Sequence, residues 1–387
     1  MGSDSSFTAL EFFAGAGMAH FGLAPHWRVI FANDYDEKKT RCYQSNFSSP
    51  SPLTRDVHSL SLNDLPTEFA DLAWASFPCQ DLSLAGARGG LQAQRSSAFF
   101  GFWSVMEALR QDHRAPHILV LENVKGLLTS HQGQDFTLLC HLLAKSGYRF
   151  GALELDAKAF LPQSRPRLFI IACRADTPLP SSFLALGEGD HYGLTPAIYT
   201  ARDRLGASHG VRWIDWHLPT PPARMASLDQ IIDPSLTWHS ADQRQALLSL
   251  MNDTHRQKVE AAHARARLTG KPQIGFIVRR TRQEQGKRQQ RAEVRFDGLS
   301  GCLRTPGGGS SRQFVIWCEG QSIETRPMAA REAARLMGLP GSFQLPTTTG
   351  AALHVIGDGL CVPVVSWLDT HLLTPLAQHL KASTEAA

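Results

Sequence analysis

Short apolar runs alternate with longer mixed segments over roughly the first 175 residues of the chain. Five runs have the length of strands: residues 7–13, 28–32, 72–76, 118–121 and 168–173. Most of them are apolar on both faces, which is typical of a parallel sheet covered by helices. The intervening stretches 98–109 and 135–145 have helical length and spacing. The first part of the chain is therefore predicted to form repeated βαβ units of an α/β fold.

The pattern changes after Thr177. Residues 178–222 are rich in proline, glycine and polar residues, and regular alternation is lost, so a second, less regular domain is predicted to begin there. Helical periodicity returns in two later stretches, at 328–337 and 362–380. The predicted domains are a catalytic and cofactor-binding domain, 1–178 completed by 352–387, and a second domain, 179–351, with a supporting helix near 328–338.

Composition limits the class of protein. With 387 residues, 43% of them hydrophobic, the chain can bury a large core. Its seven cysteines include no C-x-x-C pair, which argues against a secreted disulfide framework and a zinc ribbon. The 16 histidines form no H-E-x-x-H set, so we expect no metal site. The N-terminus lacks the features of a signal peptide, and no apolar run approaches membrane-spanning length. We therefore expect a cytoplasmic protein without a membrane partner.

Charge is concentrated in one segment. Between Arg256 and Arg295 there are 12 Lys or Arg residues and 3 Glu, a net charge of +9, whereas the whole chain carries +4. The cluster "VRRTRQEQGKRQQR" suits contacts to phosphates of a polyanion. A solvated helix face is an equally good interpretation of this segment alone.

A glycine turn follows the first predicted strand. In "ALEFFAGAGMAHFGL" the strand ends at Gly15-Ala16-Gly17, where glycines let the backbone turn tightly and approach a ligand. Asp34 ends the next strand, 19 residues after Gly15. This sequence separation is typical of an acidic residue that contacts ribose hydroxyls. The spacing fits a site for a nicotinamide dinucleotide or for S-adenosylmethionine. His20 stands where the G-x-G-x-x-G pattern of dinucleotide-binding proteins has its third glycine, and this departure favours S-adenosylmethionine. A tight turn without a ligand remains the alternative.

Three reactive groups follow neighbouring strands. Cys79 follows Pro78 just beyond the run 72–76, on a loop at the same sheet edge as the glycine turn. A thiol there can be a nucleophile or an inert loop cysteine. The run "ILVLENVKGLL" ends in Glu122-Asn123, and "PQSRPRLFIIACR" places two arginines before the next strand. Thiol, carboxyl and guanidinium are therefore expected to converge.

Six stretches in this order resemble the motifs of the DNA cytosine-5 methyltransferases. They are "FAGAG", "FPCQDLS", "ENVKGL", "QSRPR", "REAARLMGLP" and "GDGLCVPVV", and they cover nearly the whole chain outside its middle. The resemblance implies a Rossmann-like S-adenosylmethionine-dependent methyltransferase sheet and a second, irregular target-recognition domain at roughly 179–325. It also implies duplex DNA as the partner of the basic segment.

The resemblance assigns roles to individual residues. The implied catalytic residues are Cys79, Gln80, Ser83, Glu122, Asn123, Arg165 and Arg167. The implied cofactor-binding residues are Phe12 or Phe13, Ala14, Gly15, Ala16, Gly17, Asn33, Asp34, Asp56, Val57, Pro78 and Asp358. The residues expected to bind DNA are Ser83, Arg279, Arg280, Arg282, Lys287 and Arg288.

The chemistry implied for this family is methyl transfer to C5 of a flipped cytosine. Cytosine C5 is a poor nucleophile, so the Cys79 thiolate would add to C6 and make C5 electron-rich. Glu122 would hold the base at N3, and Arg165 would contact O2, whereas Arg167 would act as a catalytic residue or only brace its loop. The base must leave the duplex, which costs on the order of a few kcal/mol.

Several positions depart from the family pattern: Glu11, Met18, Ala329-Ala330 and Asp358. Asp358 is the most consequential, because an added negative charge near the cofactor could alter affinity for a cationic sulfonium. The alternatives left open are a tRNA cytosine-5 methyltransferase, a thiol hydrolase or nicotinamide enzyme, and a catalytically silent nucleic-acid binder. We expect a monomer. The target sequence, and any cognate restriction nuclease or phage-defence system, cannot be deduced from the chain.

Overall fold

The computed structural model describes residues 7–78, 98–187, 191–206, 210–224, 226–284, 286–305 and 312–385. The chain forms two compact units. The first unit comprises Met1–Asp156, Pro166–Pro221 and Val362–Ala387, and the second comprises Ala157–Arg165 and Pro222–Cys361. The boundary expected after residue 178 thus falls inside the first unit, and Arg165 and Arg167 belong to different units.

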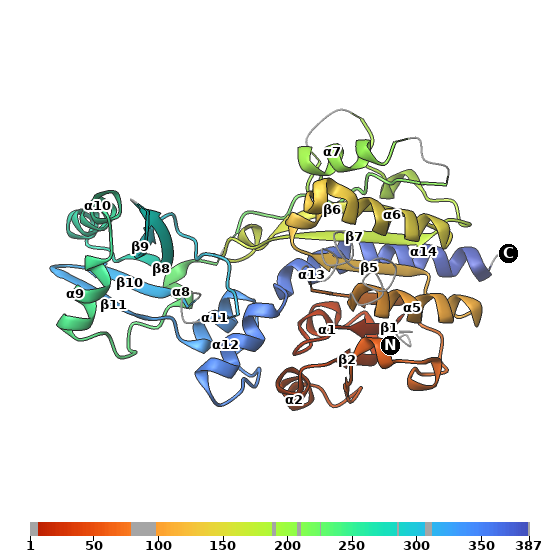
Figure 1. Cartoon of the computed structure of the whole chain (residues 1–387), viewed down its shortest axis with the longest axis horizontal. Coiled ribbons are helices and arrows are strands. Elements are labelled where there is room, and N and C mark those ends of the chain that lie inside the picture. The colour runs from red at the N-terminus through yellow and green to blue at the C-terminus, as the bar shows by residue number, and fades with distance from the viewer. Residues whose placement is uncertain are drawn as a thin grey trace. The chain divides into compact units, whose positions relative to one another are not determined.

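A seven-stranded sheet forms the centre of the first unit (Figure 1). Its strands are β1 (Phe7–Phe12), β2 (Trp27–Asp34), β3 (Leu53–Thr54), β4 (Leu72–Ala75), β5 (Ile118–Asn123), β6 (Tyr148–Asp156) and β7 (Pro166–Arg174). Their order across the sheet is β3-β2-β1-β4-β5-β7-β6. Every residue of β4 and β5 is buried, as expected for strands covered on both faces. The α/β class predicted from the sequence is confirmed.

Strand β7 departs from the parallel sheet that the apolar runs predicted. Strands β1 to β5 pair in parallel, but β7 is antiparallel to both β5 and β6. The direction of β7 has a consequence for the site, because Asn123 at the end of β5 pairs with Leu168 near the start of β7. A parallel β7 would begin at the opposite edge of the sheet.

Helices surround this sheet. They are α1 (Met18–Leu23), α2 (Glu37–Asn46), α5 (Ala98–Gln111), α6 (Gln134–Lys145), α7 (Pro196–Arg204), α13 (Val362–Leu368) and α14 (Thr374–Glu385). The helices expected at 98–109 and 135–145 are confirmed by α5 and α6. One face of α5 supplies Phe99, Phe102 and Met106 to the core, so apolar spacing was a reliable signal here.

The last helices pack against the first ones within the first unit. A Cβ atom placed on Gly22 of α1 would lie 2.5 Å from Cβ of Val365 in α13, so this position requires glycine. The Trp27 indole donates a hydrogen bond of 2.6 Å to Asp369, which is 1% exposed and also contacts Thr374. Residues more than 340 positions apart therefore share one core.

The helices between Thr349 and Ser383 are together long and apolar enough to cross a membrane by length and composition alone. Their most apolar window is 61% buried inside the structure, as in the core helix of a globular protein.

The second unit contains a four-stranded antiparallel sheet of order β11-β10-β8-β9. Its strands are β8 (Gln273–Glu284), β9 (Lys287–Arg295), β10 (Phe314–Glu319) and β11 (Ser322–Pro327). Its helices are α8 (Leu228–Ile231), α9 (Ala241–Ser249), α10 (Asp253–Thr269), α11 (Ala330–Leu336) and α12 (Thr349–Asp358). Side chains of α9 and α10 share a core with the sheet. Helix α11 confirms the helix expected near 328–338, whereas no pattern in the sequence predicted the sheet.

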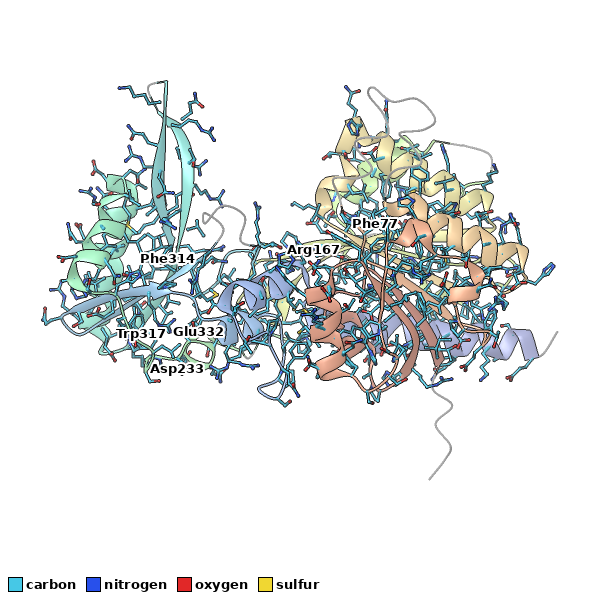
Figure 2. All side chains as sticks on the ribbon, turned by 60° about the horizontal axis from the view of Figure 1, so that its bottom comes forward. Phe77, Arg167, Asp233, Phe314, Trp317 and Glu332 are labelled. Carbon is cyan, nitrogen blue, oxygen red and sulfur yellow. The ribbon has the colours of Figure 1, made fainter. Side chains whose placement is uncertain are left out.

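A buried ion pair joins β11 to α11. Arg326 and Glu332 have side chains only 2% and 1% exposed, and their closest atoms are 2.5 Å apart. Glu332 also accepts hydrogen bonds from the backbone N–H groups of Asp233 and Ala329 (Figure 2). The carboxylate thereby caps α11 and fixes the chain before α9. This cap satisfies a backbone donor at the start of α11, where Ala329 and Ala330 supply no side-chain oxygen.

Candidate active site

The glycine turn after β1 has the backbone that its sequence requires. Phe13, Gly15 and Gly17 have φ values of 55°, 57° and 80°. A Cβ atom on Gly17 would lie 2.3 Å from the Phe47 ring, whereas one on Gly15 would meet no described atom within 4 Å. Gly17 is therefore needed for packing, and Gly15 leaves the backbone open to a ligand.

Two polar residues at the end of β2 hold this turn and the neighbouring strand. The Asp34 carboxylate accepts hydrogen bonds of 2.9 Å from the N–H groups of Gly15 and Asp36. The Asn33 side chain donates to the carbonyls of Leu53 and Arg55. Burial raises the pKa of Asp34 above its ordinary value. Asn33 thus positions β3, while Asp34 retains lone pairs that can accept hydrogen bonds from ribose hydroxyls.

Beneath the turn lies a buried carboxyl group at one of the departures from the family pattern. Glu11 is 1% exposed, and its Oε2 makes no hydrogen bond to any residue that the structure describes. Its Oε1 accepts a long hydrogen bond of 3.4 Å from the His20 backbone. Burial raises the pKa of Glu11 to about 8. The carboxyl is therefore neutral near pH 7 in the folded protein, and its Oε2 can still take part in a hydrogen bond.

The Glu11→Gln variant is expected to lose a pH dependence of stability that the wild type shows. The raised pKa keeps Glu11 protonated in the folded protein up to about pH 8, whereas the unfolded chain releases this proton near 4.5. Folding is therefore penalised increasingly as the pH rises through this window, by up to about 1.4 kcal/mol for each pH unit. Urea unfolding of both proteins at several pH values measures the effect.

Glutamine serves as the control for shape, because its neutral amide resembles the protonated carboxyl. The stability of the variant relative to wild type should increase from pH 5 to pH 8 and then stay constant. Parallel pH profiles for the two proteins would show that Glu11 titrates normally.

The remaining cofactor candidates differ in accessibility. Phe12 is fully buried and packs edge-on against Phe102, with 5.1 Å between ring centroids, so Phe13 is the aromatic that can meet a ligand. Asp56 is exposed and caps a short 3-10 turn, and Val57 beside it is buried. Ala14 and Ala16 are buried within the turn itself.

Sequence reasoning missed one candidate at this edge. Tyr35, directly after Asp34, is 71% exposed, which is high for a large aromatic side chain. An exposed aromatic ring at the end of a sheet strand, beside a glycine turn, can stack on a planar base. The signal in the sequence was its place next to Asp34.

A carboxyl and a guanidinium meet at the edge formed by the end of β5 and the start of β7. Nε of Arg167 lies 3.2 Å from Oε1 of Glu122, and both side chains are mostly buried, at 15% and 9% exposure. Glu122 pairs across the sheet with Phe169, so Arg167 is its diagonal neighbour on the same face. Antiparallel β7 therefore brings the two groups together.

Arg165 is placed differently from Arg167. It lies in the second unit, is 2% exposed, and donates hydrogen bonds to the carbonyls of Leu303, Gly357 and Gly359. These bonds connect the segment before β7 to the last motif of the chain. The sequence interpretation gave the contact to the base to Arg165, but the structure places Arg167 beside Glu122.

Asn123 anchors the segment that leads to the cysteine loop. Its side-chain amide donates a hydrogen bond of 2.9 Å to the carbonyl of Phe77, which is labelled with Arg167 in Figure 2. Pro78 follows and is exposed. Cys79, Gln80 and Ser83 lie outside the described residues. Asn123 thus fixes the start of the cysteine loop next to the Glu122–Arg167 pair.

Most of the other cysteines are poor candidates for a nucleophile. Burial raises the pKa of the Cys42 thiol to about 11 and those of Cys173 and Cys318 to about 12, and it raises the pKa of Cys140 as well. Cys361 is buried too. A thiol is reactive as the thiolate, which burial disfavours.

The remaining candidates lie in the second unit. Asp358 is exposed at the end of α12 and accepts a hydrogen bond from the Thr305 hydroxyl. The five basic residues expected to bind DNA all lie on the hairpin of β8 and β9, not on a helix. Helix α10 carries other members of the basic segment.

The fold is that of an α/β methyltransferase of known structure. A solved structure of Schizosaccharomyces pombe Dnmt2 methyltransferase is 17% identical and superposes with a TM-score of 0.57, over 96% of this chain and 99% of that one. At this identity the similarity supports the fold alone.

Two curated relatives extend the comparison to sequence. Type II methyltransferase M.NlaX of Neisseria lactamica is 24% identical over 98% of both chains. Type II methyltransferase M.Bsp6I of a Bacillus species is 32% identical over 42% of this chain and 50% of its own. The family model of C-5 cytosine-specific DNA methylases matches residues 7–373. The chain belongs to this family and is an enzyme, a DNA (cytosine-5-)-methyltransferase.

Proposed function

We propose that the protein transfers a methyl group from S-adenosylmethionine to C5 of a flipped cytosine in a specific duplex DNA sequence. Cys79 forms a transient covalent bond to C6 of the base. The observation that carries the proposal is the contact between Glu122 and Arg167, beside the segment that Asn123 holds. A cytosine ring presents N3 and O2 side by side, which suits a carboxyl and a guanidinium on one face of the sheet.

Each residue of the site then has a defined task. The Cys79 thiolate attacks C6 while Glu122 donates a proton to N3, so that negative charge does not accumulate on the ring. Arg167 contacts O2 and orients Glu122, and it takes the role that the sequence interpretation gave to Arg165. After C5 has accepted the methyl group, a solvent water molecule removes the C5 proton, the Cys79 thiolate leaves C6, and N3 returns its proton to Glu122.

The residues of the glycine turn fit the proposed cofactor. S-adenosylmethionine supplies an electrophilic methyl group on a sulfonium centre. Gly15 offers an open backbone, Asp34 suits the ribose hydroxyls, and Phe13 and Tyr35 supply aromatic surface for the adenine. Glu11 supplies a buried carboxyl oxygen that can hydrogen-bond to a polar group of the molecule. Asp56 completes the set with an exposed carboxylate.

The test of the proposed function compares substrates. Purified protein is incubated with labelled S-adenosylmethionine and either duplex DNA from an unmethylated host or tRNA. Label in 5-methylcytosine of DNA is expected. Label in tRNA alone would favour the alternative substrate, and no label in either would favour a catalytically silent nucleic-acid binder. Titration with a nicotinamide dinucleotide separates the proposed cofactor from that of the nicotinamide-enzyme alternative.

Neutralising Arg279, Arg280 and Arg282 together is expected to weaken DNA binding and flatten its salt dependence. All three lie on β8, where Arg280 and Arg282 are exposed and Arg279 lies over the Phe314 ring, 5.2 Å from its centroid. Each lost phosphate contact lowers the log-log salt slope by about 0.9. Cofactor affinity should not change, and an unchanged slope would make the segment an ordinary solvated surface.

The relatives suggest a biological setting. Both curated relatives are named type II methyltransferases, so we propose that this enzyme protects DNA against a cognate restriction nuclease. It would act as a monomer in the cytoplasm. Genomic DNA from an expressing host should then contain 5-methylcytosine at one sequence and resist a nuclease that cleaves there.

A further inference from the structure

We propose that one face of the β8–β9 hairpin reads guanine in the DNA major groove, with Arg280 and Arg282 as the reading side chains and Glu293 as the residue that positions them. The inference rests on the proposed function in requiring duplex DNA as the substrate. It assigns sequence discrimination to named residues rather than treating the basic segment as a contact to phosphates alone.

The shape of the hairpin suits a groove. At its base, Ile277, Ala292 and Val294 are buried in the core with α9 and α10. Beyond that point residues 280–283 and 286–290 are exposed on both strands, and Figure 2 shows the hairpin extending past the helices of the second unit. A two-stranded ribbon is narrow enough to enter the major groove, which is about 12 Å wide and 8.5 Å deep.

The two faces of the outer hairpin differ in the arrangement of their arginines. Cross-strand pairing places Arg280 opposite Arg291 and Arg282 opposite Gln289 on one face, here called the cationic face. The other face carries, at the same level, the pairs Thr281–Gln290 and Gln283–Arg288. DNA presents rows of phosphates on both sides of the groove. Glu293, opposite Val278, also lies on the cationic face, and Arg279 lies on the other, so the two faces carry similar net charge. What distinguishes the cationic face is a pair of exposed arginines held by one carboxylate.

Glu293 holds the two arginines of the cationic face. Its carboxylate accepts a hydrogen bond of 2.6 Å from Nε of Arg282 and lies 3.3 Å from Nε of Arg280. An isolated exposed arginine loses much rotamer freedom when it binds, whereas one that is already held by a carboxylate loses less. Bidentate contact of an arginine with O6 and N7 is the commonest specific way to read guanine.

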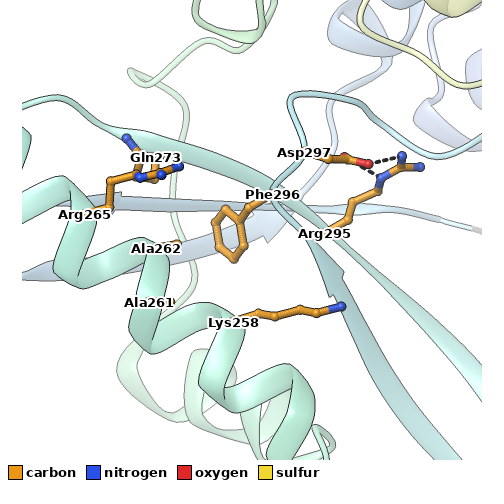
Figure 3. A pocket seen from close by; sticks show the side chains of 8 residues that line it. All are labelled: Lys258, Ala261, Ala262, Arg265, Gln273, Arg295, Phe296 and Asp297. Atoms are coloured by element: carbon orange, nitrogen blue, oxygen red, sulfur yellow. Dashed lines mark hydrogen bonds and ion pairs between the residues drawn. The ribbon is translucent and has the colours of Figure 1, made fainter.

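A second basic surface of the same unit provides the matched control. Lys258, Arg265 and Arg295 line a pocket between α10 and the sheet, together with Phe296 and Asp297 (Figure 3). Arg295 is already paired with Asp297, through a hydrogen bond of 2.8 Å from its Nε. Lys258 and Arg265 both lie on α10, away from the β8–β9 hairpin's cationic face. Neutralising them removes two charges without touching the cationic face.

The first experiment maps methylated sequences in a plasmid library with random inserts. Wild type should yield one target motif. The Arg282→Ala and Arg280→Ala variants should each methylate additional sites that carry another base at one guanine, with discrimination reduced roughly 5- to 150-fold there. Glu293→Gln should relax the same positions less strongly. The Lys258→Gln/Arg265→Gln control should lower methylation at every site and keep the motif.

The second experiment measures binding and works even where a variant methylates weakly. A target duplex in which 7-deazaguanine replaces the guanine lacks the N7 acceptor, so wild type should bind it less tightly than the normal duplex. Arg282→Ala or Arg280→Ala should bind the two duplexes equally at the guanine that it reads. Full sensitivity to 7-deazaguanine in both variants, or an unchanged motif with uniformly lower methylation, would refute the inference. Relaxed discrimination in Gln283→Ala/Gln290→Ala alone would assign reading to the opposite face.

Failure of the proposed function gives a different result. In that case wild-type protein yields no methylated motif and no preference among duplexes. An effective methyltransferase whose motif is insensitive to Arg280, Arg282 and Glu293 would defeat only the inference drawn from the hairpin.

Discussion

Replacing Cys79 with serine is expected to abolish methyl transfer while cofactor binding persists. A serine hydroxyl is a far weaker nucleophile than a thiolate at neutral pH, so C6 is not attacked and C5 stays unreactive. A duplex with 5-fluorocytosine at the target should trap the wild-type enzyme, because fluorine cannot leave as a proton does. A denaturant-resistant protein–DNA adduct should therefore form with wild type, only when S-adenosylmethionine is present.

Peptide mapping should place this adduct on Cys79. The matched control is Cys42→Ser, which removes a buried thiol whose pKa is raised to about 11 and should leave the adduct intact. Methylation by Cys79→Ser at a rate comparable to wild type, or an adduct on another cysteine, would contradict the mechanism.

The Glu122→Gln variant is expected to lose about 10²- to 10⁴-fold in turnover, the usual contribution of a positioned acid or base. Glutamine keeps the size of the side chain and can still hydrogen-bond to Arg167, but it cannot donate and recover a proton at N3. Single-turnover methylation at saturating DNA measures the chemical step. DNA binding should stay close to that of wild type, because the phosphate contacts lie elsewhere.

Arg167 and Arg165 should respond differently to the same conservative change. Arg167→Lys loses the planar fork beside Glu122 and should slow turnover at nearly unchanged melting temperature. Arg165→Lys loses bonds to three backbone carbonyls and should lower the melting temperature. A stability loss confined to Arg167→Lys would reverse these assignments and return the base contact to Arg165.

The strands of the first unit were predictable where they are apolar throughout. The buried runs of β4 and β5 are 4 and 6 residues long, too short for a typical helix, so their length and composition indicate strands. The direction of β7 was not predictable, because the composition of an apolar run does not show whether the strand runs parallel or antiparallel to its neighbours. The sequence interpretation also did not recognise β6, the strand that precedes β7. The convergence of Glu122 with an arginine was therefore expected for an incorrect reason, since a parallel strand would begin at the opposite edge.

The sequence alone also does not determine whether Arg165 or Arg167 contacts Glu122. The two residues have the same chemistry and lie two positions apart, so pattern alone cannot show which one reaches Glu122. The answer depends on register with β5 and on carbonyls contributed by residues 303, 357 and 359, which lie 138 to 194 positions later in the chain. The hairpin of the second unit was hidden similarly, because its outer residues are polar on both faces and carry no alternating signal.

The packing of Asp369 against Trp27 has a consequence for synthesis of the chain. A ribosome delivers residues in order, so the nascent first unit waits for the segment after Val362 while all of residues 222–361 emerge. The Trp27 indole and the face of α1 around Gly22 remain without their final partners during that interval. The second unit can therefore complete its folding first, and chaperone binding to the nascent chain is expected to persist until the last helices appear.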